Sequence, residues 1–312
     1  MATTAVLGPH TSVGAAITRK LRLDGHEVIE VSPAGSTIEL KAALAGATAV
    51  VHAADASDTE AILDAAAGIA AEQVVLLSSA AVYGAWADNP VPLTEDAILR
   101  PNPGIEEVAA RAEIERRSHE WSADHPACAV TILRPCTVVV PGAHDWPSAD
   151  LDGIAGLGSG DGGRPVQFLH VEDLAGAVAV VLDNKISGLR NVAPAGWINE
   201  DEARALSGGR VVPLPEPVRR AFRRVRLGKT VNRGAEALSS HPWVIASDAL
   251  RAEGWSPVFD NREALVATRR PTRWQRLSPT KRQELSMAVV GGAAVIAIVA
   301  AVIGLRRRAR AR

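Results

Sequence analysis

Residues 74–84, Val-Val-Leu-Leu-Ser-Ser-Ala-Ala-Val-Tyr-Gly, indicate the fold class of this chain. Four apolar residues bounded by small polar ones are typical of a short, fully buried strand in a parallel sheet. The run ends at Ser78 and Ser79, so two hydroxyl groups lie at the carboxyl end of this strand, the edge at which open α/β sheets bind ligands. A hydroxyl at that edge has a catalytic or cofactor-orienting role, or it caps a turn. The strand by itself leaves both interpretations open.

The residues around this strand alternate between strand-like and helix-like patterns. Apolar runs predict strands at 2–7, 26–31, 48–52, 130–133 and 166–169, and helices are expected at 15–23, 39–44, 58–71, 104–121 and 174–182. Past residue 194 the pattern changes to small mixed elements. We therefore predict an α/β protein with a Rossmann-like doubly wound parallel sheet and a small C-terminal substrate lobe.

The first predicted strand is followed at once by a glycine-containing turn, Gly8-Pro-His-Thr-Ser-Val-Gly14, and then by a helix. This arrangement places a pyrophosphate on backbone N–H groups at the helix N-terminus. Gly8 permits the tight turn and Gly14 permits close packing of the helix on the strand. The middle glycine of the usual fingerprint is absent, and Thr11 stands near its place. The expected cofactor contacts are Gly8, His10, Thr11, Ser12, Val13 and Gly14, although His10 is also consistent with an ordinary exposed loop histidine.

Two other strand ends are candidates for cofactor binding. An acidic residue after the second strand would normally bind the adenosine ribose, but the sequence there is Ser32-Pro33. A serine accepts one hydroxyl hydrogen bond and distinguishes NAD from NADP poorly, so either cofactor is expected. After the third strand, Ala53 and Ala54 would let a cofactor pack closely, and they are equally consistent with ordinary packing.

The composition excludes several classes of function. Hydrophobic residues make up 47% and charged residues 22% of the chain, which is typical of a globular protein. The 34 basic and 35 acidic residues nearly cancel, so no nucleic-acid partner is expected. Cys128 and Cys136 lie on one predicted strand, about 26 Å apart if it is extended, which is beyond the reach of a disulfide. No spacing of ligand residues indicates a metal site.

The C-terminal part of the sequence predicts a membrane anchor. Residues 287–305 contain no charge, and a helix of this length spans about 28 Å, close to the ~30 Å core of a bilayer; a buried core helix is the alternative. Arginines follow this run, and no signal peptide is apparent at the N-terminus. We therefore expect a single C-terminal pass in the cell membrane with the main domain in the cytoplasm. The basic stretch 219–227 would bind anionic membrane lipid, grip a phosphate-rich ligand or form a solvated helix face.

The expected organisation has five parts. They are an NAD(P)-binding domain at 1–190, the substrate lobe at 191–268, a basic juxtamembrane linker at 269–286, the transmembrane helix at 287–305 and a basic tail at 306–312.

Six motifs in order resemble the extended short-chain dehydrogenase/reductase superfamily, in particular its NAD-dependent epimerase/dehydratase branch. They are Val6–Gly14, Val51–Ala54, Ser78–Gly84, Leu133–Pro135, Gln167–Leu174 and Asn191–Pro194, and the resemblance extends from Thr4 to Leu265. It implies a nucleotide cofactor, NAD or NADP, which Pro135 also contacts, and a nucleotide-sugar or lipid-linked substrate. It leaves a homodimer open.

The resemblance also implies a catalytic set of three side chains. A serine or threonine holds the substrate hydroxyl, a tyrosine transfers its proton, and a lysine four residues later supports the tyrosine and binds the cofactor ribose. Ser79 matches the first, but Glu107 and Arg111 occupy the tyrosine and lysine positions. A carboxyl group is ordinarily ionised at neutral pH and is a poor proton donor, and an arginine cannot act as a titrating amine. The only tyrosine, Tyr83, falls on the Val-Tyr-Gly motif, so it does not replace the missing one.

Three hypotheses follow. In the first, the protein is a membrane-anchored NAD(P)-binding protein whose standard chemistry is lost or reduced, and Glu107 and Arg111 form an i,i+4 pair that supports their helix by about 0.3–0.5 kcal/mol. In the second, it is an active oxidoreductase or epimerase that uses Ser79, with a buried Glu107 as its base. In the third, the domain binds no cofactor and serves as an interaction module.

Overall fold

The structure, a computed structural model, describes residues 3–32, 37–53, 58–141, 163–206, 237–238 and 240–267. The chain divides into two units, 1–269 and 270–312, and the second lies wholly outside the described residues. Ala54, the basic stretch 219–227, the predicted linker, the predicted anchor and the basic tail also lie outside them. Among the helices that the structure describes, none is long and apolar enough to cross a bilayer.

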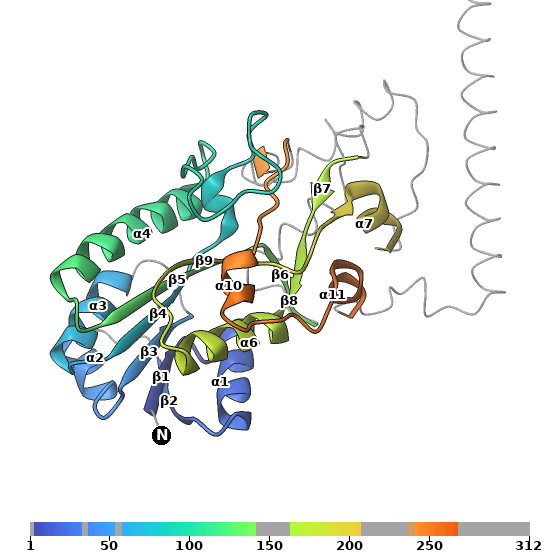
Figure 1. Cartoon of the computed structure of the whole chain (residues 1–312). Coiled ribbons are helices and arrows are strands. Elements are labelled where there is room, and N and C mark those ends of the chain that lie inside the picture. The colour runs from blue at the N-terminus through green and yellow to red at the C-terminus, as the bar shows by residue number, and fades with distance from the viewer. Residues whose placement is uncertain are drawn as a thin grey trace, which may run out of the picture. The chain divides into compact units, whose positions relative to one another are not determined.

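A parallel sheet of six strands forms the centre of the first unit, in the order β2-β1-β3-β4-β5-β9 (Figure 1). The strands are β1 (Thr3–Leu7), β2 (Glu27–Val31), β3 (Ala49–His52), β4 (Gln73–Leu77), β5 (Ala129–Pro135) and β9 (Gly188–Val192). The order reverses between β1 and β3, where Leu7 lies opposite His52. Because ligands of open α/β sheets bind at such a reversal, this edge is where a site is expected. The predicted doubly wound sheet is confirmed.

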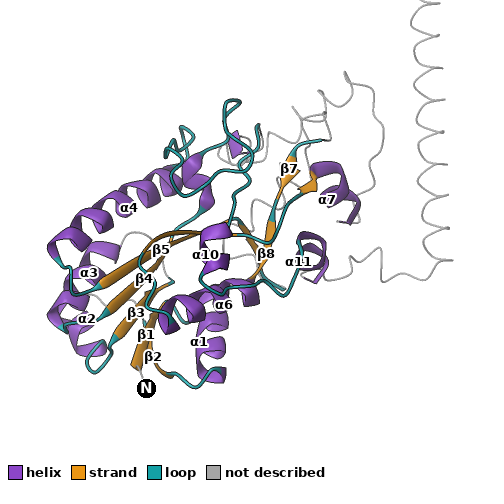
Figure 2. Cartoon of the chain, in the orientation of Figure 1, coloured by secondary structure: helices purple, strands orange, loops and turns teal. Residues whose placement is uncertain are grey.

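Helices cover both faces of the sheet (Figure 2). One face carries α1 (Ser12–Leu23) and α6 (Val171–Asp183), and the other carries α2 (Thr37–Ala43), α3 (Thr59–Gly68) and α4 (Glu106–Asp124). Successive side chains of a strand point to opposite faces of its sheet. Since helices cover both faces, every residue of β4 is buried.

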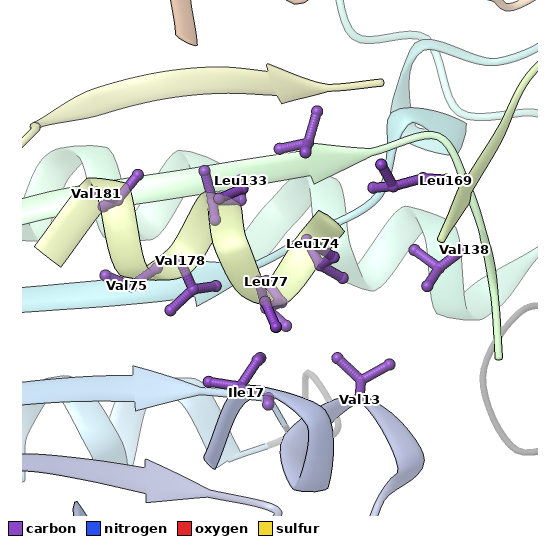
Figure 3. Close-up of a cluster of buried hydrophobic side chains, with 14 of the residues drawn as sticks. Val13, Ile17, Val75, Leu77, Leu133, Val138, Leu169, Leu174, Val178 and Val181 are labelled. Atoms are coloured by element: carbon purple, nitrogen blue, oxygen red, sulfur yellow. The ribbon is translucent and has the colours of Figure 1, made fainter. Parts of the chain in front are cut away.

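Two hydrophobic cores follow from this alternation. Val75 and Leu77 of β4 pack with Val13 and Ile17 of α1 and with the apolar side of α6, as Figure 3 shows. The alternate residues of β4, Val74 and Leu76, belong to the second core, under α2 and α3. A run that is apolar on both faces is thus the sequence signal of a central strand covered by two layers of helices.

The remaining elements are short, and several of them form a smaller core. β6 (Thr137–Val139) pairs with β8 (Phe168–His170), and β7 (Pro165–Val166) pairs with β10 (Ile198–Asn199). The helical elements here are α7 (Glu200–Leu206), α10 (Asp248–Ala252) and α11 (Asn261–Ala267). The single strand predicted at 166–169 is thus two strands, β7 and β8. Residues of β6, β7 and β8, which precede position 191, pack with α7 and α11.

Candidate functional site

The turn between β1 and α1 is closed by the side chain of Thr11. Thr11 is the N-cap of α1, and its Oγ1 accepts a hydrogen bond from the backbone N–H of Gly14 at 2.9 Å. The same hydroxyl donates to the carbonyl oxygen of Gly8 at 2.9 Å. Thr11 therefore ties the two glycines of the predicted nucleotide turn together.

Gly8 and Gly14 perform two of the roles that the dinucleotide fingerprint gives to glycine. Gly8 has a φ of +82°, a conformation that favours glycine, so the chain turns sharply after β1. A β-carbon on Gly14 would lie 2.1 Å from the carbonyl oxygen of Gly8, so only glycine lets α1 approach the turn this closely. The third role, an open backbone position beside the pyrophosphate, belongs to the middle glycine of the fingerprint, which is absent here, and Thr11 stands near its place.

The carboxyl ends of β1, β2 and β3 meet at this turn. The backbone N–H of Gly8 donates to the carbonyl of Val31 at 3.3 Å, and that of Ala53 donates to the carbonyl of Leu7 at 3.0 Å. Ser32 is exposed just after β2, whereas Ala53 is fully buried. His10 is exposed in the turn.

These residues fit a nucleotide in part. The glycine turn, the N-terminus of α1 and the small buried Ala53 suit a phosphate and a closely packed nucleoside. Ser32 offers a hydroxyl where an acidic residue would hold the ribose. Thr11 carries a side chain near the place of the middle glycine of the usual fingerprint.

Ser79 caps a turn at the end of β4. Its Oγ accepts a hydrogen bond from the backbone N–H of Ala81 at 3.2 Å, at the start of the 3₁₀ helix η2 (Ala80–Tyr83). The residue is 9% exposed. The structure thus assigns the turn-capping role to this hydroxyl, which still has its own proton to donate to a ligand.

Arg111 lies beside the same strand end. Its side chain is 4% exposed, and the guanidinium donates from Nη1 to the carbonyl oxygen of Leu77 at 3.0 Å, two residues before Ser79. Its Nη2 contacts Glu107 Oε1 at 3.2 Å, so the predicted i,i+4 pair is present. The Glu107 side chain is 63% exposed, so the buried Glu107 of the second hypothesis is not found. The structure therefore brings Ser79, Arg111 and Glu107 to one edge but leaves the last in solvent contact.

A buried polar network lies behind this edge, and it was not foreseen from the sequence. Arg134 donates from Nε and Nη2 to Oε2 of Glu115, at 2.9 and 2.6 Å, and both side chains are almost completely buried. Ser78 donates to the other oxygen of Glu115. The network thus joins β5 and α4 to the end of β4.

Tyr83 extends this network and is fully buried. Its hydroxyl donates to Asn191 Oδ1 at 2.9 Å and accepts from Arg134 Nη1 at 2.7 Å. Burial raises the pKa of Tyr83, and the charge of Arg134 opposes the rise. Tyr83 is therefore held in the protein interior by its hydrogen bonds. Pro135, the predicted cofactor contact next to Arg134, is buried at the end of β5, opposite Val192 of β9.

One sequence signal for this network was present but ambiguous. Glu115 follows Arg111 by four residues on α4, and Arg134 interrupts an apolar strand directly before a proline. Charged residues are rarely buried unless they are paired, and neither partner identifies the other from the sequence.

Comparison with known proteins agrees with this fold. The family model described as the NAD dependent epimerase/dehydratase family matches residues 33–193. A protein of Sinorhizobium fredii designated y4nG is 32% identical over 170 residues, which are 50% of this chain; the match spans only 41% of the length of that curated relative.

Solved structures with the same fold include several enzymes of sugar nucleotides. UDP-glucose 4-epimerase from Thermus thermophilus, in complex with NAD, is 18% identical, with a TM-score of 0.63 and coverage of 85% of this chain and 97% of that chain. UDP-glucose 4-epimerase from Thermotoga maritima, with UDP-glucose, is 14% identical, with a TM-score of 0.65 and coverage of 85% and 97%. The dTDP-glucose 4,6-dehydratase DesIV from Streptomyces venezuelae, with NAD bound, is 18% identical, with a TM-score of 0.65 and coverage of 85% and 95%.

At these identities the structural likeness shows the fold alone. The family model, however, covers just over half of the sequence. The chain therefore belongs to the NAD dependent epimerase/dehydratase family.

Proposed function

We propose that this protein binds NAD or NADP at the reversal of the sheet, together with a nucleotide-linked sugar or a related ligand, and that its Ser-Tyr-Lys chemistry is lost or reduced. Family membership supports the cofactor, as do structures of the same fold that hold NAD or UDP-glucose. The turn with Gly8 and Gly14 would hold the phosphates, and Ser32 would accept a hydrogen bond from a ribose hydroxyl. When bound, the nicotinamide supplies hydride transfer.

The observation that carries the loss of standard chemistry is the identity and exposure of the residues next to Ser79. Glu107 is exposed and paired with Arg111, whose guanidinium contacts a backbone carbonyl. Tyr83 is held in the buried network by Arg134 and Asn191. No residue beside Ser79 on α4 offers the phenolic proton of a tyrosine. Since one well-placed general acid–base contributes about 10²–10⁴ in rate, turnover of the usual kind would be greatly slowed.

Calorimetric titration of NAD(H) and NADP(H) into a version that ends at Arg270 tests the cofactor. We expect saturable binding of at least one of the four. No binding at millimolar concentration would refute the proposal and favour the third hypothesis, an interaction module without cofactor.

The active-enzyme alternative has a specific observation in its favour, because Glu107 and Arg111 lie on one helix face beside the strand end of Ser79. Its test is turnover of NAD-loaded protein on UDP-glucose and related nucleotide sugars. Turnover that the change Glu107→Gln abolishes would establish this alternative. Measurable turnover that is equal in both proteins would assign the chemistry to another group.

We further propose that residues 287–305 anchor the protein in the cell membrane as a single pass, with the main domain in the cytoplasm. The support is the apolar run and the arginines that follow it in the sequence. Removal of 287–312 should move the protein from the membrane fraction to the supernatant after centrifugation. If the shortened protein remains in the membrane fraction, the basic stretch 219–227 or a partner holds it there.

A further inference from the structure

We propose that Thr11 limits the affinity of the nucleotide turn for the pyrophosphate bridge of a dinucleotide. The inference rests on the proposed function, because it concerns how tightly the same turn holds its cofactor. It assigns to the Thr11 side chain a role in how well the turn binds a pyrophosphate bridge, which the positions of the glycines alone do not indicate.

The first step concerns hydrogen-bond donors. The first four N–H groups of a helix have no partner within the helix, and they are the donors that a bound phosphate uses. In α1 the N–H of Gly14 is bonded instead to the Oγ1 of Thr11, at 2.9 Å. The side chain therefore occupies a donor that a glycine at position 11 would leave for the ligand.

The second step concerns the orientation of that side chain. The Thr11 hydroxyl accepts from the N–H of Gly14 and donates to the carbonyl of Gly8, so its single proton and one of its two lone pairs are engaged within the turn. The backbone N–H of Thr11 also donates to the Gly8 carbonyl, at 3.1 Å. These hydrogen bonds to Gly8 and Gly14 hold Thr11 in one orientation, and its side chain does not rotate without breaking them.

The third step concerns the backbone. Thr11 has φ −72° and ψ 151°, an extended conformation that any residue adopts. The backbone conformation at position 11 thus does not require glycine. In the fingerprint, a glycine at this position serves to leave space for the ligand. Replacement of Thr11 by glycine is consequently expected to preserve the turn while opening it.

The fourth step concerns charge. The first turn of α1 contains no acidic residue, whereas the first turn of α6 contains Glu172 and Asp173. The positive end of the α1 dipole is therefore not neutralised by a carboxylate of its own turn, and it still attracts an anion. The turn therefore still attracts phosphate. However, the Thr11 side chain takes up one hydrogen-bond donor and some of the space, and this loss weakens the binding of a pyrophosphate more than that of a single phosphate.

The test is calorimetric titration of NAD and AMP into the full-length protein in detergent micelles, for the wild type and three variants. T11G should bind NAD about tenfold more tightly or better, since one charge-assisted hydrogen bond and the space of a side chain are gained. AMP has no pyrophosphate bridge, and its affinity should change by less than about threefold. T11A, which frees the Gly14 N–H but keeps a β-carbon, should be intermediate. T11S, the matched control, keeps both hydrogen bonds and should resemble the wild type.

Two results would overturn the inference. If the wild type binds NAD as tightly as T11G or more tightly, Thr11 does not limit affinity, although the proposed function stands. If neither protein binds NAD or AMP, the proposed function fails and this inference fails with it. Thermal unfolding shows whether each variant is folded, and should T11G not fold, the comparison of T11A with T11S decides the question.

Discussion

Loss of the buried carboxylate of Glu115 should destabilise the protein strongly. The side chains of Glu115 and Arg134 are 4% and 3% exposed, and two hydrogen bonds join them. After the change Glu115→Leu, the remaining partners of Arg134 among the described residues are the Tyr83 hydroxyl and the Glu95 carbonyl, at 2.7 and 3.3 Å. Its charge is then buried without a counter-ion, which costs about 3–5 kcal/mol in the free energy of unfolding.

A double-mutant cycle separates this charge effect from lost packing. Arg134→Met alone leaves Glu115 as an unpaired buried carboxylate and should cost a similar amount. The double variant removes both charges together, so it should be no less stable than either single variant. The resulting coupling between the two residues is therefore expected to be at least as large as the smaller single cost, about 3 kcal/mol. Urea unfolding followed by tryptophan fluorescence and circular dichroism gives the free energies.

Glu113 on the same helix provides the control. It pairs with Arg116 at the surface, where both side chains are about half exposed (44% and 54%), so Glu113→Leu should leave the unfolding midpoint nearly unchanged. Additive effects in the Glu115 and Arg134 cycle, or a Glu115→Leu variant as stable as the Glu113→Leu variant, would refute the assignment of a buried ion pair.

Three further predictions concern local features of the fold. Gly14→Ala should destabilise the protein by about 1–3 kcal/mol, because its β-carbon would lie 2.1 Å from the carbonyl oxygen of Gly8, whereas Gly176→Ala in α6, with nothing nearer than 4.0 Å, should be neutral or stabilising in the same urea titration. Burial lowers the pKa of His170 below its ordinary value of 6.5, so at lower pH the unfolded chain binds more protons than the folded one. Stability should therefore fall as the pH drops from about 7.5 to about 5.5, more steeply in the wild type than in His170→Asn, and equal slopes would contradict this. Burial raises the pKa of the Cys128 thiol to about 11, so its alkylation by iodoacetamide, measured by mass spectrometry, should keep rising about tenfold per pH unit from about pH 8 to about pH 10; a plateau above about pH 9 would show an ordinary exposed thiol.

The sequence predicted the elements whose signals are local. The all-apolar run of β4 indicated a strand covered on both faces, and both cores are present on its two sides. Gly8 and Gly14 indicated the turn into α1, and both have the geometry that requires glycine. The i,i+4 contact between Glu107 and Arg111 was predicted as well, since helical spacing alone brings such residues together.

The environment of each site residue was decided by residues distant in sequence. Tyr83 and Asn191 are 108 positions apart, yet their hydrogen bond holds the only tyrosine of the chain away from solvent. Glu115 and Arg134 are buried because α4 packs beside β5, and nothing in either local sequence specifies that contact. From the sequence alone, Ser79 could either cap a turn or hold a ligand. The path of the chain after β4 decided that its Oγ accepts a hydrogen bond from the backbone N–H of Ala81.

The sequence by itself thus determined the sheet, its turn and the helical spacing of Glu107 and Arg111, because these depend on residue identity and on short-range periodicity. Only the tertiary structure decided which charged side chains are buried, which hydroxyl groups are hydrogen-bonded and that Glu107 remains exposed. The reason is that burial and hydrogen bonding depend on the packing of segments far apart in the chain.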